Sequence, residues 1–307
     1  MINVFIDGKA GTTGLRIEER LSARDDINIV SLPEALRKDT EARREIINSS
    51  DVVFLCLPDD AAREAVSLVE NDKVVIIDAS TAHRTNPGWA YGFPELSKEH
   101  EEKIKTSTRI AVPGCHASGF IALVYPLIKA GIISPEAHLF AHSLTGYSGG
   151  GKKMIADYEM DMRDPLLDAP RQYGITQMHK HLPEMTAITG LKTPPIFSPI
   201  VASFYSGMEV TVPLFASDIN GNINDIKNIY LNHYNSSIIK FIDESEGGFL
   251  SAGAYSGRDS MGISVFGNDE RILLVARYDN LGKGASGAAV ECLNVRCGVD
   301  KEKTLVL

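Results

Sequence analysis

The sequence predicts an α/β protein with two domains: a Rossmann-like domain on a parallel sheet, and a second α+β domain. Three observations predict this. Short, continuously apolar runs alternate with amphipathic segments up to about residue 115, as in a parallel sheet covered on both faces. A glycine-rich turn follows the first apolar run. Beyond residue 131 the apolar stretches are longer and follow one another, which is typical of an α+β domain.

The elements of the first half can be placed in chain order. We expect strands at 2–6, 27–32, 51–58 and 73–80, and helices at 15–23, 40–50 and 59–70. A helix over 118–130 follows, with Ser118 as its N-cap and Gly131 as its C′ residue. Each strand then connects to the next through a helix, the connection that parallel strands require.

The second half contains β-like stretches at 138–146, 199–215 and 271–278, with a turn signal at Asn220-Gly221. The chain then returns to a helical pattern, which we expect to pack back on the first domain. The predicted boundaries are therefore residues 1–116, completed by a C-terminal helical segment 283–307, for the dinucleotide-binding domain. We expect residues 117–282 to form the catalytic and oligomerisation domain.

Composition narrows the class of protein. The chain has 307 residues, 44% hydrophobic and 23% charged, with a net charge of -9 and no block of like charge. This balance argues against a nucleic-acid partner or a membrane anchor. The longest apolar stretch, 119–133, is interrupted by Pro126 and Lys129. The chain opens directly on a strand, without a targeting pattern, so we expect a cytoplasmic protein.

The four cysteines, Cys56, Cys115, Cys292 and Cys297, show no CxxC spacing, so we expect neither a metal site nor a disulfide framework. Cys115 differs from the others because "VPGCHASG" places it after a Pro-Gly bend at the start of a predicted helix. The helix dipole and free N–H groups would stabilise a thiolate there. The alternative for any cysteine is a buried structural thiol, which suits the other three.

The stretch "IDGKAGTTG" places Gly8, Gly11 and Gly14 between the first strand and the first helix. Glycine lets the backbone approach a pyrophosphate, and the helix N-terminus presents N–H groups to it. The alternative is a strand–helix turn without a ligand. Cofactor preference stays open: Glu34 could bind the ribose diol of NAD, while Ser31 with Arg37 or Lys38 could bind the 2′-phosphate of NADP.

Two further patterns are candidates for chemistry. "HKHLPE" contains His179, His181 and Glu184, which could supply an acid/base histidine and a carboxylate that orients it; metal binding is the rival interpretation. "TGYSGGGKK" joins Ser148 and three glycines to Lys152, which could bind an anion. The alternative there is a flexible hairpin tip.

Taken in order, these motifs resemble the N-acetyl-gamma-glutamyl-phosphate reductases of the shorter type (type 2), over nearly the full chain. The resemblance rests on "GKAGTTGLRI", "DASTAHR", "YGFPEL", "VPGCHASG", "TGYSGGGK", "HKHLPEM" and "DNLGKGASGAAVECLN". It implies a fold of the semialdehyde dehydrogenase type. It also implies NADPH-dependent reduction of N-acetylglutamyl 5-phosphate to the 5-semialdehyde, with release of phosphate, in arginine biosynthesis. A homo-oligomer, dimer or tetramer, is the implied assembly.

The resemblance also implies residue roles. Cys115 is the nucleophile, and His181 or His179, with Glu184, provides acid/base catalysis. The implied cofactor-binding residues are Gly8, Gly11, Thr12, Thr13, Gly14, Ser80, Asn280, Lys283 and Gly284. We take Ser148, Gly149 and Lys152 as candidates for binding the substrate's phosphate or carboxylate. His116 departs from the pattern, because the family more often has tyrosine after the cysteine.

Two alternatives remain. Aspartate-semialdehyde dehydrogenases share the two-domain plan and the thioester chemistry, and pocket shape rather than motif spacing decides the substrate. A non-catalytic NADP-sensing protein would need no nucleophile, so Cys115 with the histidine pair argues against it.

Overall fold

The computed structural model describes residues 1–307, which form two compact units. The first comprises residues 1–114 and 285–305, and the second comprises residues 115–284 with 306 and 307. The expected boundaries differ from these by two residues, because helix α5 begins at Cys115 and carries His116 with it. The last two residues belong to the second unit, where Val306 N donates to Asp259 Oδ2 at 2.9 Å.

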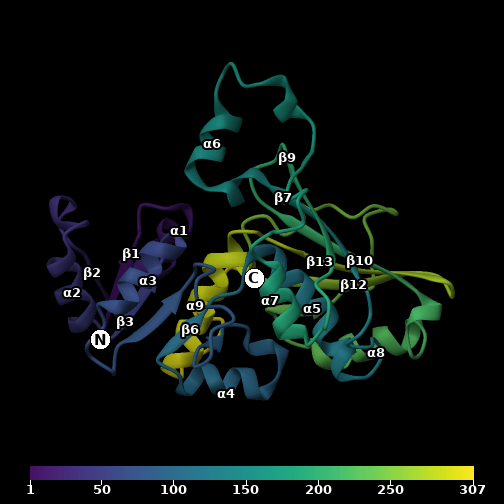
Figure 1. Cartoon of the computed structure of the whole chain (residues 1–307), viewed down its shortest axis with the longest axis horizontal. Helices are drawn as coiled ribbons and strands as arrows, with labels where there is room; N and C mark the ends of the chain where they lie inside the picture. The colour runs from purple at the N-terminus through teal and green to yellow at the C-terminus, as the bar shows by residue number, and fades with distance from the viewer. The chain divides into compact units, whose positions relative to one another are not determined.

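The first unit contains a six-stranded, wholly parallel sheet in the order β2-β1-β3-β4-β6-β5. Strands β1, β2, β3 and β6 of this sheet are labelled in Figure 1. Its strands are β1 (Ile2–Asp7), β2 (Ile27–Val30), β3 (Val52–Leu55), β4 (Val75–Asp78), β5 (Ala90–Tyr91) and β6 (Arg109–Ala111). Its helices are α1 (Thr12–Ser22), α2 (Thr40–Ser49), α3 (Asp59–Ser67), α4 (Lys98–Thr106) and α9 (Gly287–Cys297), with 3₁₀ turns at Glu34–Leu36 and Pro94–Leu96. This confirms the predicted α/β class.

Alternate residues of each strand enter two separate cores. Val52 and Phe54 of β3 pack with residues of α1, α4 and α9, whereas Val53 and Leu55 pack with residues of α2 and α3. Both faces of the sheet are therefore covered, which is why the strands read as continuous apolar runs. The C-terminal helix α9 completes one of these faces, with Ala289 and Leu293 fully buried.

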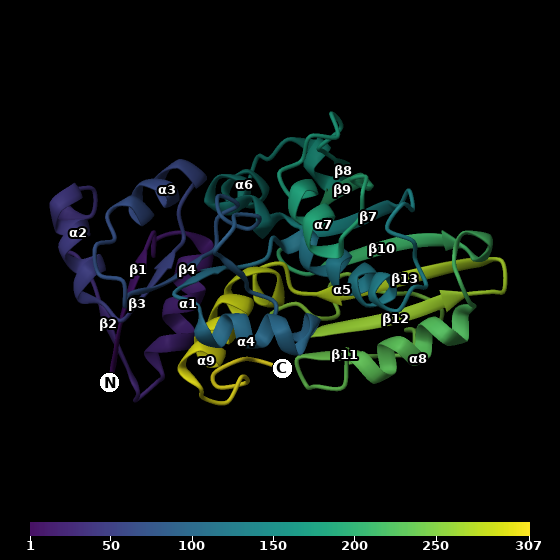
Figure 2. The same ribbon diagram turned by 60° about the horizontal axis from the view of Figure 1, so that its bottom comes forward.

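The second unit is built on a seven-stranded mixed sheet in the order β11-β12-β13-β10-β7-β9-β8 (Figure 2). Its strands are β7 (Phe140–Gly146), β8 (Arg171–Gln172), β9 (Ile196–Ala202), β10 (Met208–Phe215), β11 (Ile239–Phe241), β12 (Met261–Gly267) and β13 (Arg271–Tyr278). Its helices are α5 (Cys115–Lys129), α6 (Gly151–Glu159), α7 (Leu182–Thr189) and α8 (Ile223–His233), with 3₁₀ turns at Tyr147–Gly150, Pro165–Asp168 and Ala216–Asp218. No helix is long and apolar enough to span a bilayer.

Helix α5 is almost entirely buried and packs on β10 and β13. Pro126 lies inside it and has no N–H to bond the carbonyl of Ala122. The hydroxyl of Tyr234 donates to that carbonyl instead, at 2.7 Å. The helix therefore continues through the proline without leaving a buried carbonyl oxygen unpaired.

Two local predictions in the second unit are wrong, and one alternative is excluded. Ser118 is not an N-cap, because α5 already begins at Cys115. Asn220-Gly221 does not turn a hairpin; it precedes α8, whose N-cap Asn222 forms a capping box with Asp225. The glycine run at 149–151 is not a hairpin tip but the join between a 3₁₀ turn and α6.

Candidate active site

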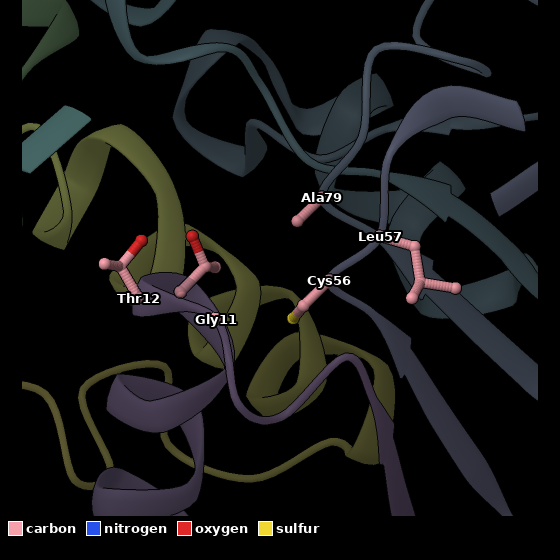
Figure 3. A pocket seen from close by; sticks show the side chains of 6 residues that line it. Gly11, Thr12, Cys56, Leu57 and Ala79 are labelled. Carbon is pink, nitrogen blue, oxygen red and sulfur yellow. The ribbon is translucent and has the colours of Figure 1, made fainter. Parts of the chain in front are cut away.

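A pocket of about 170 Å³ opens at the N-terminus of α1 in the first unit (Figure 3). It is lined by Gly11, Thr12, Thr13, Cys56, Leu57 and Ala79. No side chain caps the first turn of α1, and that turn contains no acidic residue. The helix end can therefore offer its N–H groups to an anion, as a pyrophosphate site requires.

Two glycines of this loop are required by the packing of the backbone. Gly8 has φ +84°, and a Cβ there would lie 2.3 Å from the carbonyl oxygen of Cys56. A Cβ on Gly14 would lie 2.6 Å from Cα of Lys9. Gly11 meets no such obstacle and lines the pocket instead. The loop thus fits the backbone of a dinucleotide-binding turn.

The residues that follow β3 and β4 complete the pocket. Cys56 follows β3, and burial, with Asp78 and Asp7 nearby, raises the pKa of its thiol to about 12. Ala79 follows β4 and lines the pocket, whereas the hydroxyl of Ser80 donates to Asp78 Oδ2 at 2.7 Å. The Ser80 side chain therefore holds the turn rather than facing the pocket wall. Cys56 and Ala79 can be recognised because each directly follows a parallel strand, and not from the spacing of the glycines.

Two of the residues predicted to bind the ribose of the cofactor, Glu34 and Arg37, form an ion pair with each other. Arg37 Nε lies 3.0 Å from Glu34 Oε1, and both side chains are largely exposed. The carboxylate that would bind the ribose diol of NAD thus contacts the cation that would bind the 2′-phosphate of NADP.

Cys115 is the first residue of α5, at the helix end where the dipole is positive. Its backbone is held by a phenol from β13. The hydroxyl of Tyr278 accepts from Gly119 N at 3.0 Å and donates to the Cys115 carbonyl oxygen at 2.5 Å. It thereby takes the place of the ordinary bond between those two groups in the first helical turn. A Cβ on Gly119 would lie 2.7 Å from this hydroxyl, so the insertion needs glycine.

Three histidine rings lie close together, and one of them belongs to His116, the residue after Cys115. The ring centroid of His116 lies 5.7 Å from that of His179 and 5.6 Å from that of His181. The rings of His179 and His181 are 4.7 Å apart. The fold therefore brings the segment before α7 to the residue that follows the cysteine, although the two are more than sixty positions apart in the sequence. The structure contains no group of three or more His, Cys, Asp or Glu side chains arranged to hold a metal ion.

The two histidines of this segment have different surroundings. His179 Nδ1 accepts from the backbone N–H of His181 at 3.2 Å, and its ring lines an apolar surface pocket beside Leu182. His181 is only 5% exposed and occupies the N-cap position of α7. Glu184 is 1% exposed in the first turn of the same helix, where a carboxylate complements the dipole.

His116 is linked to two further hydroxyls. Its Nδ1 lies 2.7 Å from Ser143 Oγ and its Nε2 lies 2.5 Å from Tyr173 Oη. Burial, with His179 nearby, lowers the pKa of His116 to about 3. Burial, and then the charge of a thiolate at Cys115, raises the pKa of Tyr173. His116 is therefore a neutral hydrogen-bonding group at ordinary pH.

The burial of neutral His116 should make stability depend on pH. Because the unfolded chain binds a proton near pH 6.5 and the folded chain only near pH 3, the unfolded state holds more protons between these values. The free energy of unfolding should therefore be fully retained above pH 6.5 and fall as the pH is lowered toward 3, by up to a few kcal/mol. His116→Gln, which does not titrate, should show a shallower loss in urea unfolding at pH 7 and pH 4.5. Parallel pH slopes for the two proteins would contradict this assignment.

The remaining candidates fall in two groups. Ser148 is fully buried, and Asn280 Nδ2 donates to its hydroxyl at 3.0 Å, while Asn280 Oδ1 accepts from Gly207 N at 2.9 Å. These two side chains support the loop, whereas Gly149 and Lys152 are exposed. Gly284 lies against Cys115: a Cβ there would come within 3.1 Å of Cβ of Cys115. Its neighbour Lys283 is 2% exposed in a π-helical turn, Gly282–Ser286.

Sequence reasoning missed several residues of the site. Cys56, Leu57 and Ala79 could have been found as residues that follow parallel strands. Tyr173, Ser143 and Tyr278 carried no local signal, because each reaches the site from a distant element.

Comparison with known proteins agrees with this arrangement. Residues 3–104 match the semialdehyde dehydrogenase NAD binding domain, and residues 115–280 match the semialdehyde dehydrogenase dimerisation domain. An aspartate semialdehyde dehydrogenase II from Vibrio cholerae superimposes with a TM-score of 0.72 at 15% identity, over 97% of this chain and 99% of that one. The fold and the two matched domains thus define a protein of the semialdehyde dehydrogenase class.

Closer relatives narrow the class. An N-acetyl-gamma-glutamyl-phosphate reductase 2 from Nostoc sp. is 45% identical, over 97% of this chain and 98% of its own. An N-acetyl-gamma-glutamyl-phosphate reductase from Sinorhizobium medicae is 44% identical, over 95% of this chain and 97% of its own. The chain belongs to the N-acetyl-gamma-glutamyl-phosphate reductase family and is an oxidoreductase with a nicotinamide-nucleotide-binding domain.

Proposed function

We propose that the protein reduces N-acetyl-L-glutamyl 5-phosphate to N-acetyl-L-glutamate 5-semialdehyde and releases phosphate, through a thioester on Cys115, in arginine biosynthesis. The observation that supports this most is the position of Cys115 at the first residue of α5, with the histidine rings gathered beside its neighbour. A thiol so placed is a nucleophile near neutral pH, and an acyl phosphate is an activated acyl donor.

NADP(H) is the proposed cofactor. The uncapped first turn of α1 and the backbone of Gly8 and Gly11 fit its pyrophosphate, with Thr12 and Thr13 at the same end of the helix. Asn280, Lys283 and Gly284 are proposed to hold the nicotinamide side, and Ser80 to shape the turn beside the pocket. When bound, the cofactor supplies the hydride that takes the acyl group to the aldehyde level.

The residues of the second unit perform the acyl-transfer steps. The Cys115 sulfur attacks the carbonyl carbon of the acyl phosphate, forming a C–S bond. The C–O bond to phosphate breaks, and phosphate leaves with the electron pair. After reduction the C–S bond breaks, the aldehyde is released and the thiolate is regenerated.

His181 is the proposed acid/base residue, and His179 a neighbour that positions it. His181 is buried beside His116, whereas His179 is half-exposed and its Nδ1 accepts the backbone N–H of His181. His181 would take the thiol proton before attack and protonate the regenerated thiolate afterwards. Glu184, buried on the same first turn, would favour the imidazolium form.

Lys152 and Gly149 are proposed to bind the substrate's phosphate or carboxylate. Gly149 is exposed in the 3₁₀ turn before α6 and Lys152 in the first turn of α6, and the buried Ser148–Asn280 bond fixes the turn that leads there. Lys152→Ala should raise KM for phosphate and for the semialdehyde about tenfold, with little change in kcat, because a ground-state ion pair is lost. Lys153→Ala is the matched control. Unchanged KM values in the Lys152 variant would remove this residue from the substrate site.

The second unit is also proposed to form a homo-oligomer through one face of its sheet. Ile196 of β9 lies opposite Phe140 of β7, and Pro213 of β10 lies opposite Leu273 of β13. Apolar residues are thus found on four neighbouring strands of the sheet. Phe140, Pro213 and Leu273 also line a cavity of about 730 Å³. Leu273→Glu should therefore shift sedimentation toward the monomer, because a charge would be buried in the interface. Sedimentation identical to the wild type would contradict this placement of the interface.

One assay tests the proposed reaction directly. NADP⁺ reduction is followed at 340 nm with N-acetylglutamate 5-semialdehyde, with and without phosphate. We expect turnover that requires phosphate and prefers NADP⁺ to NAD⁺. Aspartate semialdehyde run in parallel distinguishes the nearest alternative activity. Absence of phosphate-dependent turnover with the acetylated substrate would overturn the proposal.

A further inference from the structure

The side chain of Gln177 binds the edge of strand β9. Its Nε2 donates to the carbonyl oxygen of Phe197 at 2.8 Å, and the N–H of Phe197 donates to its Oε1 at 2.9 Å. Phe197 is 1% exposed, so both of its backbone groups need partners away from water. The amide supplies one donor and one acceptor, as the backbone of a neighbouring strand would.

The amide occupies this place because the neighbouring strand ends early. Strand β8 ends at Gln172, and Tyr173 N donates to the carbonyl oxygen of Pro199 at 3.0 Å. The chain then leaves the sheet through a turn, in which Gly174 has φ +62° and Gln177 N donates to the Gly174 carbonyl oxygen at 3.0 Å. Gln177 therefore reaches β9 with its side chain from a turn, where a longer β8 would have used its backbone.

Gln177 holds this position in a left-handed backbone conformation. Its φ is +57°, in a region that residues other than glycine seldom adopt. A residue stays in such a conformation only where its surroundings hold it there, and such residues concentrate at functional sites. The next polar side chains along the chain are those of His179, Lys180 and His181. The strained turn thus comes directly before the histidine pair.

The ring of Phe197 connects this edge to the histidines. Its centroid lies 5.1 Å from that of His179, at an interplanar angle of 71°, and 5.3 Å from that of His116, at 72°. The energy of such edge-on contacts depends on the orientation of the rings. The Nδ1 of His179 accepts the backbone N–H of His181 at 3.2 Å, and their ring centroids are 4.7 Å apart. A fixed Phe197 therefore orients His179, and His179 contacts the proposed acid/base residue.

The geometry points to Gln177 as a positioning residue for the histidine pair. Its amide fixes the backbone of Phe197, and its turn fixes the segment that carries His179 and His181. This assignment rests on the proposed function, because it concerns the acid/base residue of that reaction. Gln177 does not titrate and takes no part in the proton transfers. Its contribution is orientation, and a displacement of about 1 Å in a catalytic group can lower the rate about a hundredfold.

Gln177→Gly tests the assignment, because it removes the amide and also relieves the backbone strain. We expect kcat for phosphate-dependent NADP⁺ reduction to fall about tenfold or more, with KM for the semialdehyde changed less than about twofold. Labelling of His179 and His181 by diethylpyrocarbonate, followed by peptide mass spectrometry of the full-length protein, should become faster, since the segment opens more often. The labelling needs neither substrate nor cofactor.

Gln177→Glu tests the two hydrogen bonds without shortening the side chain. An ionised carboxylate accepts the Phe197 N–H but repels the Phe197 carbonyl oxygen, whereas a protonated one can donate to it. The kcat of this variant, divided by that of the wild type at each pH, should therefore rise as the pH is lowered from about 8 to about 5. Both proteins share the titratable side chains of the surrounding elements: Tyr173, His179, Lys180 and His181 of the loop, and His116 of α5.

Gln172→Gly and Gln172→Glu are the matched controls, since Gln172 is an exposed glutamine at the end of β8, and both should keep wild-type kcat and labelling rates. A Gln177→Gly protein with a lower melting temperature but wild-type kcat and labelling would show a purely structural role and overturn the assignment. A kcat ratio for Gln177→Glu that does not vary with pH would overturn it as well. Failure of the proposed function looks different: the wild type would lack phosphate-dependent turnover, while the faster labelling in Gln177→Gly would remain.

Discussion

Cys115→Ala should lose at least about 10⁴-fold in kcat for phosphate-dependent NADP⁺ reduction. Without the sulfur no thioester can form, and no neighbouring side chain offers a comparable nucleophile. Binding of the dinucleotide should be largely retained, because the proposed pyrophosphate pocket is lined by residues of the first unit and not by Cys115. Steady-state kinetics and NADP⁺ titration by fluorescence would measure the two properties separately.

Cys297→Ala is the matched control for this variant. Cys297 is a half-buried thiol at the end of α9, and burial raises its pKa. We expect this variant to keep wild-type activity. Substantial activity in Cys115→Ala, or an equal loss in Cys297→Ala, would contradict the assignment of the nucleophile.

His181→Asn should lower kcat by about 10²- to 10⁴-fold, the usual contribution of a general acid or base. The loss should be larger than in His179→Asn, because the His179 ring lines the surface pocket and its Nδ1 accepts the backbone N–H of His181. The pH profile of kcat/KM should also lose one of its limbs in the His181 variant. Kinetics over pH 5–9 measure both effects.

The comparison of the two histidine variants decides the assignment. A larger loss of kcat in His179→Asn than in His181→Asn would make His179 the acid/base residue and His181 its neighbour. Glu184→Gln should fall between the wild type and His181→Asn, since it changes the stability of the imidazolium and leaves the imidazole in place.

The first unit could be predicted closely, because its strands are buried on both faces and their apolar runs are continuous in the sequence. Residues such as Val52 to Leu55 need no knowledge of their partners to be recognised as a parallel strand. The glycine loop could also be predicted from a short stretch of the sequence. Gly8 and Gly14 are required by contacts with Cys56 and Lys9, close to where the pattern itself indicates a turn.

The second unit was less predictable because non-local contacts define it. Strand β12 and helix α8 were not predicted, and the start of α5 was placed three residues late. Ser118 looks like an N-cap, but the Tyr278 hydroxyl, from far along the chain, holds the first turn at Cys115 instead. The candidate site shows the same limit: the motifs could propose Cys115 and the pair His179 and His181, whereas the position of Tyr173 beside His116 is known only from the structure.

His116 shows the same limit most clearly. In the sequence it is only an unexpected neighbour of the cysteine. In the structure it is a neutral, buried link between Ser143 and Tyr173, and its lowered pKa follows from burial that no local pattern reveals. The hydrogen-bonding position of His116 therefore becomes apparent only when α5, β7 and the segment after β8 are considered together.

The central claim is the acyl-enzyme on Cys115, and a single-turnover experiment without phosphate tests it most directly. The enzyme is mixed with N-acetylglutamate 5-semialdehyde and NADP⁺, and absorbance at 340 nm is followed by stopped flow. The account predicts a burst of up to one NADPH per active site, an N-acetylglutamyl adduct on the Cys115 peptide, and steady turnover once phosphate is added. No burst without phosphate, and no adduct on Cys115, would contradict it.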